Sequence, residues 1–362
     1  MAHFHALRVQ SVRPETEDAV SIVFEIPADL AGQFRYVPGQ YLTLRRDFDG
    51  TDVRRSYSIC SGADDGDLRV AVKAIPGGVF STWATTQLKA GETLQVMEPA
   101  GRFGITPDPE RAASYVLFAA GSGITPVLAI LKSLLSREPG SDVTLFYGNR
   151  NSQSIMFREE LEDLKNRYMG RLRVFHVLSR ERQEVDLFNG RIDRAKVADL
   201  LKVLVDAPAV EGFYLCGPEG MVEDVKAALA AGGVEPGRIH AELFTAPGAS
   251  KVAGGPTREE TRRRAAASGE VSHVTVIMDG DRWDFDMPRG DYVLDAGQEA
   301  GLDLPFACKG GVCATCRAKV VEGQAVMDQN WGLEPEEVEA GYVLTCQTRP
   351  ASDRMVVDFD QP

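Results

Sequence analysis

The first part of the chain, up to about residue 105, consists of short apolar or alternating runs separated by turn residues. The runs are LRVQSV, AVSIVFEI, QYLTLRR, RSYSIC, LRVAVKAI and TLQVMEP. β-Branched and alternating residues favour strands, and the Gly, Pro and Asp residues between them favour turns. Six short strands without a long helix predict a small antiparallel β-barrel, which we place at residues 1–107.

The pattern changes near residue 112, where apolar strand runs begin to alternate with helical periods. The strand runs are SYVLFAA, VTLFYG, LRVFHVLS, GFYLCG and HAELF, and the helical periods include PVLAILKSLLS and MVEDVKAALAAGG. This alternation is typical of βαβ units around a parallel sheet. We therefore predict an α/β domain at residues 108–245, with its ligands beyond the carboxyl ends of the strands.

The remaining third begins with a segment that cannot bury a core. Residues 246–270 are rich in Ala, Gly and Pro and poor in large apolar groups, which predicts a flexible linker. Residues 271–362 contain the strand runs HVTVIM, RWDFDM and RMVVDFD, and we expect a third, smaller domain there. This domain holds 7 Lys and Arg against 17 Asp and Glu, a net charge of −10 out of −13 for the whole chain.

Composition narrows the functional classes. A chain of 362 residues is long enough for two or three domains. A net charge of −13 argues against nonspecific binding to nucleic acid or to an anionic membrane. We found neither a signal-peptide pattern nor an apolar run long enough for a membrane span, so we expect a cytoplasmic protein. Six cysteines in such a chain indicate metal binding or catalysis before disulfides.

Four of these cysteines follow the pattern C-x4-C-x2-C-x29-C. They are Cys308, Cys313, Cys316 and Cys346. The spacing matches that of plant-type [2Fe–2S] ferredoxins. Zinc is the alternative metal, but structural zinc sites usually use two short pairs of ligands, and the three-plus-one spacing fits them poorly. A set of buried or disulfide-bonded cysteines is the alternative without metal.

Two further regions carry possible nucleotide-binding motifs. In the barrel, RRSYSI offers a cation, an aromatic face and hydroxyls, and GGVFSTW offers Gly77 and Gly78 before the start of a helix. In the α/β domain, GSGITP at residues 121–126 lies between a strand and a helix, where backbone N–H groups favour an anion. A tyrosine in the core or a simple Gly-Gly turn would explain each barrel motif by itself.

Taken together, the motifs resemble those of the ferredoxin–NADP⁺ reductase superfamily, over the whole chain. R-x-Y-S at residues 55–58 and G-x-x-S at 78–81 look like the FAD motifs of that family. G-x-G-x-x-P at 121–126 looks like its nicotinamide motif, and Cys-Gly-Pro at 216–218 like its strand-end loop. The resemblance implies an FAD-binding antiparallel β-barrel, an NAD(P)-binding α/β domain and a β-grasp-like [2Fe–2S] ferredoxin domain.

The resemblance also implies roles for individual residues. Tyr57 would stack on the isoalloxazine ring, Ser58 would bond near its N5, and Thr125 would lie between flavin and nicotinamide. Ser58, Cys216 and Glu242 are the implied catalytic residues at the hydride-transfer site. The implied FAD-binding residues are Arg55, Ser56, Tyr57, Ser58, Val72, Lys73, Gly77, Gly78, Val79, Phe80 and Ser81. The implied nicotinamide-binding residues are Gly121, Ser122, Gly123, Thr125, Pro126, Arg150, Ser179, Arg180, Cys216, Gly217 and Pro218.

NADPH is favoured over NADH because Arg150, Ser179 and Arg180 follow two successive strands and could meet a 2′-phosphate. Solvated surface charge is the alternative role of these arginines.

The order flavin, nicotinamide, ferredoxin is that of several oxygenase reductases, some of which use FMN. The implied partner is the oxygenase component of a multicomponent monooxygenase with a di-iron centre, docked through the acidic ferredoxin domain. A Rieske oxygenase, a desaturase, a stand-alone diaphorase and a ferredoxin domain that serves only for docking are the alternatives.

Overall fold

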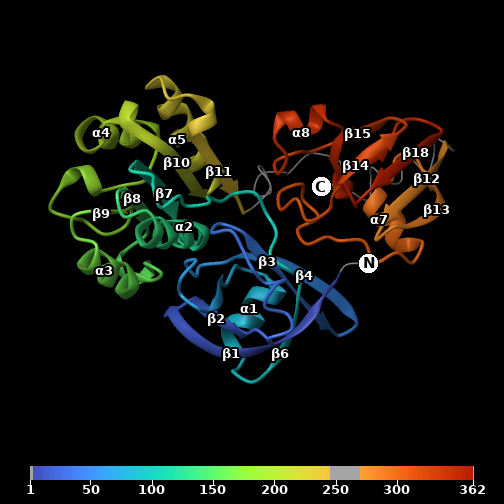
Figure 1. Ribbon diagram of the computed structural model, residues 1–362, viewed down its shortest axis with the longest axis horizontal. Coiled ribbons are helices and arrows are strands. Elements are labelled where there is room, and N and C mark those ends of the chain that lie inside the picture. The colour runs from blue at the N-terminus through green and yellow to red at the C-terminus, as the bar shows by residue number, and fades with distance from the viewer. Residues whose placement is uncertain (1–2, 245–269, 362) are drawn as a thin grey trace. The chain divides into compact units, whose positions relative to one another are not determined.

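The computed structural model describes residues 3–244 and 270–361 (Figure 1). Residues 4–244 form one compact unit, and the described residues from 270 onward belong to a second. All of the predicted linker except Glu270 lies outside the described residues. Within the described residues, no helix is both long and apolar enough to cross a membrane. The predicted cellular location stays a prediction.

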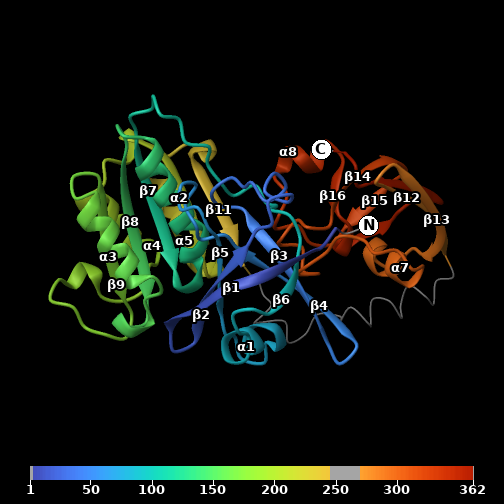
Figure 2. The same cartoon turned by 60° about the horizontal axis from the view of Figure 1, so that its bottom comes forward.

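The first unit begins with a six-stranded antiparallel barrel. Its strands are β1 (His5–Thr16), β2 (Ala19–Glu25), β3 (Tyr41–Phe48), β4 (Thr51–Ser58), β5 (Leu68–Lys73) and β6 (Thr93–Val96), in the order β4-β3-β6-β1-β2-β5. A bridge between Ile59 and Val70 joins the end of β4 to β5 and closes the barrel. The short helix α1 (Val79–Thr86) follows β5, and Figure 2 shows it at one end of the barrel. The predicted barrel is confirmed.

The second half of this unit is a parallel sheet with helices on both faces (Figure 1). Its strands are β7 (Ser114–Ala120), β8 (Asp142–Asn149), β9 (Leu172–Leu178), β10 (Val210–Gly217) and β11 (Ile239–Leu243), in the order β11-β10-β7-β8-β9. Its helices are α2 (Ile124–Arg137), α3 (Arg158–Arg167), α4 (Arg194–Leu204) and α5 (Glu219–Ala231). Successive residues of β7 point to opposite faces, so Leu117 packs with α2 while Val116 and Phe118 pack with α5. The chain first adds β8 and β9 on one side of β7 and then β10 and β11 on its other side. This reversal of strand order creates a switch point beside β7, where such sheets bind their ligands.

The second unit is a small twisted sheet that packs against a helix. The elements are β12 (Val271–Met278), β13 (Asp281–Pro288), α7 (Val293–Glu299), β14 (Arg317–Glu322), β15 (Ala325–Met327), α8 (Pro335–Glu339), β16 (Tyr342–Leu344), β17 (Thr348–Pro350) and β18 (Arg354–Asp358). The main sheet has the order β13-β12-β18-β14-β16, with β12 and β18 parallel. This is the expected β-grasp-like arrangement. The loop between α7 and β14 carries three of the four motif cysteines.

Candidate functional site

The end of β4 brings the predicted flavin residues onto the barrel surface. The Tyr57 ring is only partly buried and lies 5.7 Å from the ring of Phe80, measured between centroids. Arg55 is exposed, and its one described contact is a hydrogen bond from Nη1 to the Arg54 carbonyl, at 2.7 Å. The neighbouring Arg54 is instead buried and paired with Asp52 at 2.8 Å. The strand therefore presents an aromatic face and a cation that is not engaged by a carboxylate among the described contacts.

The helix that follows begins with two glycines for two different reasons. Gly77 has a φ of +75°, which L-residues with a side chain rarely adopt. At Gly78, a Cβ would lie 2.4 Å from Ser81 Oγ and 2.6 Å from a side-chain carbon of Ile75. Ser81 Oγ accepts a hydrogen bond from the Ile75 N–H and donates one to the Gly78 carbonyl, both at 3.3 Å. The glycines thus leave the backbone N–H groups at the start of α1 open to an approaching phosphate.

A surface cleft of about 450 Å³ lies beside these glycines and was not predicted from the sequence. Gly77, Gly78, Arg46, Phe48 and Trp83 contribute to its lining. The Arg46 guanidinium lies over the Trp83 ring, 4.0 Å from its centroid. The part of FAD beyond the flavin ring requires a cation, an aromatic face and a helix start that can accept a phosphate. The residues of this cleft supply all three, so they fit FAD. The sequence GGVFSTW contains Trp83, but nothing in it places Arg46 beside that ring.

Two residues that were predicted to contact the flavin have side chains with structural surroundings. The Val72 side chain is fully buried in the barrel core. The Lys73 ammonium pairs with Asp18 at 2.9 Å. Their role in binding a cofactor stays a prediction, and the described contacts of both side chains are structural.

The predicted nicotinamide motif forms the turn between β7 and α2. Gly121 has a φ of +54°, and its carbonyl accepts a hydrogen bond from the Tyr147 hydroxyl at 2.9 Å. At Gly123, a Cβ would lie only 2.1 Å from the carbonyl oxygen of Cys216. Thr125 is buried in the first turn of α2, with its hydroxyl donating to the Ser122 carbonyl at 3.0 Å. The motif is therefore packed directly against the end of β10, which carries Cys216 and Gly217 and is followed by Pro218.

The three predicted catalytic residues come together from three strands. Cys216 and Glu242 are register partners on β10 and β11. Ser58, at the end of β4 in the barrel, donates a hydrogen bond from Oγ to Glu242 Oε2 at 3.4 Å, across 184 residues of sequence. The site therefore lies where the barrel meets the carboxyl ends of the parallel sheet.

The electrostatics of this site favour neutral side chains. Burial raises the pKa of Glu242 to about 8, although the bond from Ser58 acts in the opposite direction. Burial, together with the neighbouring Glu242, also raises the pKa of the Cys216 thiol. Both shifts favour the protonated carboxyl and the thiol, which together with the Ser58 hydroxyl can donate hydrogen bonds without carrying a negative charge.

The predicted 2′-phosphate residues lie at the ends of β8 and β9. The Arg180 N–H donates to the Arg150 carbonyl at 2.7 Å, which holds the two arginines side by side. Both side chains are exposed. Ser179 and Arg180 line a second cleft, of about 430 Å³, together with Glu181. The Glu181 carboxylate is occupied by hydrogen bonds from Ser152, which lower its pKa.

The four motif cysteines lie in two pairs in the second unit. The side chains of Cys308 and Cys313 are within hydrogen-bonding distance of each other, as are those of Cys316 and Cys346. A cluster with two irons, each bound by two thiolates, fits this pairing better than a single tetrahedral zinc. Among the described residues, no three Cys, His, Asp or Glu side chains are placed to hold one metal ion.

The loop around these cysteines directs backbone N–H groups at the sulfurs. The N–H groups of Gly310 and Cys313 donate to Cys308 Sγ at 3.3 and 3.4 Å. Gly311, with a φ of +75°, directs its N–H at the Cys346 sulfur. Such bonds stabilise the negative charge of iron-bound thiolates and tune the cluster potential. The residues present therefore fit the cluster.

Comparison with protein families gives three matches in chain order. The Oxidoreductase FAD-binding domain matches residues 6–105, the Oxidoreductase NAD-binding domain residues 117–227, and the 2Fe-2S iron-sulfur cluster binding domain residues 276–351. The three cofactors are therefore FAD, a nicotinamide nucleotide and a [2Fe–2S] cluster.

Relatives of known function match almost the whole chain. One of the subunits of the 1,2-phenylacetyl-CoA epoxidase of Escherichia coli is 45% identical over 99% of both chains. The ferredoxin reductase component of the 3-ketosteroid-9-alpha-monooxygenase of Rhodococcus rhodochrous is 36% identical over 98% of this chain and 96% of its own. Among solved structures, phthalate dioxygenase reductase covers 98% of both chains with a TM-score of 0.59 and 22% identity, which supports the fold.

Proposed function

We propose a specific function for this chain, which belongs to the ferredoxin–NADP⁺ reductase superfamily, in the group of FAD- and [2Fe–2S]-containing reductase components of multicomponent oxygenases. The chain uses NADPH to reduce an oxygenase that epoxidises phenylacetyl-CoA. The observation that carries the chemistry is the meeting of Ser58 with Glu242 and Cys216 at the boundary between the barrel and the parallel sheet. The similarity to a component of the phenylacetyl-CoA epoxidase over 99% of both chains supports the choice of oxygenase.

The cofactors divide the chemistry between them. When bound, FAD accepts a hydride from a reduced nicotinamide and releases its electrons singly, and the [2Fe–2S] cluster carries one electron at a time. The protein residues position and insulate these groups. Ser58 donates to Glu242 across the boundary, and the raised pKa of that carboxyl favours its neutral form beside the anionic nucleotide.

NADPH is the proposed nicotinamide because two exposed arginines lie at the end of the sheet. Neither Arg150 nor Arg180 has an ion-pair partner among the described contacts, and the nearby Glu181 is engaged by Ser152. A guanidinium binds a phosphate through two parallel hydrogen bonds, which NADH would leave unused.

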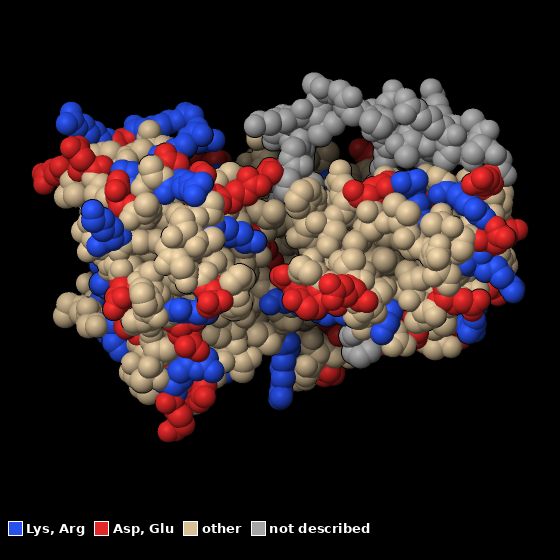
Figure 3. Space-filling view, turned by 90° about the horizontal axis from the view of Figure 1, so that it is seen from above, with Lys and Arg blue, Asp and Glu red and all other residues tan. Residues whose placement is uncertain are grey.

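The second unit is the proposed docking module for the oxygenase. Three exposed acidic residues, Glu334, Glu336 and Glu339, lie at α8, and acidic side chains gather over this helix in the space-filling view (Figure 3). Trp331 precedes the helix, is 46% exposed, and donates its backbone N–H to the Gly311 carbonyl of the cluster loop at 2.9 Å. Exposed aromatic side chains are typical of interface centres, and the backbone of this one is hydrogen-bonded to the cluster loop. The exposed glutamates at α8 would be complementary to a basic surface on the oxygenase.

The deciding experiment combines the holoprotein with the other components of a phenylacetyl-CoA epoxidase, with and without phenylacetyl-CoA. NADPH consumption and formation of the epoxide are measured beside Cys313→Ser, which removes one cluster ligand. Product that depends on both substrate and cluster supports the proposal. Rapid NADPH oxidation with artificial acceptors but no epoxide would show that this chain serves a different oxygenase, and a 3-ketosteroid monooxygenase would then be tested next.

A further inference from the structure

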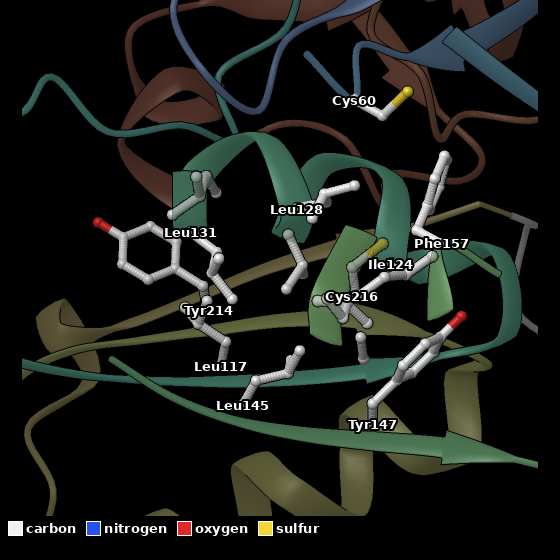
Figure 4. Packing of buried hydrophobic residues seen from close by; sticks show 14 of the residues in the cluster. Cys60, Leu117, Ile124, Leu128, Leu131, Leu145, Tyr147, Phe157, Tyr214 and Cys216 are labelled. Atoms are coloured by element: carbon white, nitrogen blue, oxygen red, sulfur yellow. The ribbon is translucent and has the colours of Figure 1, made fainter. Parts of the chain in front are cut away.

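One face of helix α2 packs against the barrel, opposite the face that covers the parallel sheet. In Figure 4, Cys60 lies on one side of α2, and Leu117 and Leu145 of the sheet lie on the other. Barrel residues, including Cys60, Ala71 and Phe103, belong to the same apolar cluster as the buried leucines of α2. Because one core crosses the boundary, a change in the contacts of α2 acts on both halves of the hydride-transfer site.

A barrel loop is bound to this face of α2 by polar contacts. The loop comprises residues 61–65 and begins three residues after Ser58. The Ala63 N–H donates to Ser133 Oγ at 2.9 Å, and Arg137 donates to Asp64 at 2.8 Å. At Gly62, a Cβ would lie 2.7 Å from the Cβ of Lys132, so backbone and helix are in direct contact.

An ion-pair network closes over the same contact. Arg69, on β5 of the barrel, donates two hydrogen bonds to Glu160 of α3, at 2.7 and 2.8 Å. Lys132 of α2 pairs with both Glu160 and Asp65. The side chains of Arg69 and Lys132 are only 10% and 12% exposed, so water screens these pairs poorly. Although burial opposes ionisation, Arg69 and Lys132 keep the pKa of Glu160 below its ordinary value.

The network is rigidly connected to both sides of the hydride-transfer site. Lys132 lies seven residues after Thr125 on one helix, which corresponds to about 10 Å at 1.5 Å per residue. On the barrel side, the loop that contains Asp65 continues directly from the strand that ends with Ser58. A shift of α2 relative to this loop therefore moves Thr125 relative to Ser58.

We propose that Glu160 and Lys132, together with Arg69 and Asp65, are positioning residues that hold the nicotinamide-binding turn at the correct distance from the flavin strand. They do not touch the reacting atoms, and their effect on hydride transfer is exerted through α2. A displacement of about 1 Å at a reacting centre can reduce a rate about 100-fold. The inference rests on the reductase function and is independent of the identity of the oxygenase.

The test compares Glu160→Gln with Glu162→Gln in the FAD-loaded holoprotein. Glu162 lies two residues further along α3 and forms an exposed pair with Arg158 at 3.1 Å, so it is a matched control. Flavin reduction is followed under anaerobic conditions over a range of NADPH concentrations, and backbone hydrogen exchange of residues 61–65 and 239–243 is measured in parallel.

We expect Glu160→Gln to lower the limiting rate of flavin reduction about tenfold or more, with little change in the NADPH concentration needed for half-saturation. Hydrogen exchange in both segments should become faster, and Lys132→Arg, which retains the charge, should keep most of the wild-type rate. Glu162→Gln should match the wild type.

A Glu160→Gln protein with a lower Tm but the limiting rate of Glu162→Gln would overturn the proposal, because the network would then only stabilise the fold. If Glu160→Gln fails to accumulate as holoprotein, Ser133→Ala decides, since it removes the acceptor of the Ala63 N–H and otherwise only a hydrogen bond within α2, from Ser133 Oγ to the Ala129 carbonyl at 2.7 Å. It should lower the limiting rate at least threefold, and an unchanged rate would count against the proposal. A wild-type protein that does not oxidise NADPH or NADH would instead contradict the reductase function itself.

Discussion

Replacement of Gly123 by Ala tests whether the nicotinamide-binding turn is held in place by direct backbone contact. The added Cβ would lie 2.1 Å from the Cys216 carbonyl oxygen and 2.8 Å from the Gly217 nitrogen. An ordinary carbon–oxygen contact is about 3.3 Å or more, so the turn and β10 must separate by about 1.2 Å. Because the φ of Gly123 is −61°, alanine is conformationally acceptable there, and the effect comes from the overlap alone.

This displacement should act directly on the reaction. Both Thr125 and Cys216 flank the predicted hydride-transfer site, so we expect the limiting rate of flavin reduction by NADPH to fall about 10- to 100-fold. The overlap should also cost about 1–3 kcal/mol of stability, as overpacking does elsewhere. The rate is measured in anaerobic single-turnover experiments on protein with equal FAD content, and stability by thermal unfolding.

Gly220→Ala is the matched control for this substitution. Gly220 lies in helix α5, shortly after Cys216, and a Cβ there would meet no atom within 4 Å. Alanine in a helix should stabilise the protein by about 0.5–1 kcal/mol and leave the rate unchanged. If Gly123→Ala reduced its flavin within twofold of the Gly220→Ala rate, the turn would not be positioned by its contact with β10, and the steric reasoning would be wrong.

Three further predictions concern the other parts of the molecule. Arg180→Ala should raise the KM for NADPH about tenfold or more, as expected for loss of a charged hydrogen bond, and leave the KM for NADH unchanged; equal effects on both would remove Arg180 from the 2′-phosphate site. The pKa of Glu242 is raised in the folded protein to about 8 from 4.5, so its stabilising contribution is complete below about pH 4.5 and is lost as the pH rises through 8. The Tm of the wild type relative to Glu242→Gln should therefore decrease between pH 5 and pH 8, and a constant difference would contradict the raised pKa. Trp331→Ala should lower the rate of electron transfer to the oxygenase about tenfold and leave the rate of ferricyanide reduction unchanged. In the wild type, the rate of transfer to the oxygenase should fall as the salt concentration rises. Val321→Ala, which changes an equally exposed side chain on β14, should leave the transfer rate unchanged.

The parts of the site that depend on local chain geometry were predictable from the sequence. The cysteine spacing predicts the four cluster ligands because the loop between Cys308 and Cys316 must fold around its own sulfurs. The glycine pairs at 77–78 and 121–123 indicate turns before helices for the same reason, since each requirement is met within a few residues. Short strand runs without a long helix likewise predicted the barrel, and the alternation of strand and helix patterns that follows predicted the parallel sheet.

The contacts of the site that join two distant segments could not be predicted from the sequence in this way. Nothing near Arg46 in the sequence places it over Trp83, and the ion pair of Lys73 with Asp18 follows from strand pairing. The contact of Arg69 with Glu160 spans 91 residues and exists only because two domains pack together. Similarly, the meeting of Ser58 with Glu242 and the raised pKa of that carboxyl require burial that neither segment provides alone.

The sequence by itself therefore determined the three domains and the motifs from which the cofactor residues and the cluster ligands are predicted, because each motif is encoded by spacing within a short stretch. Only the tertiary structure decided how the barrel and the parallel sheet are held together, and hence which contacts Ser58, Cys216 and Glu242 make and how the pKa values of the last two shift. The physical reason is that charge, burial and distance in that site are properties of the packed boundary, and its residues are far apart in the chain.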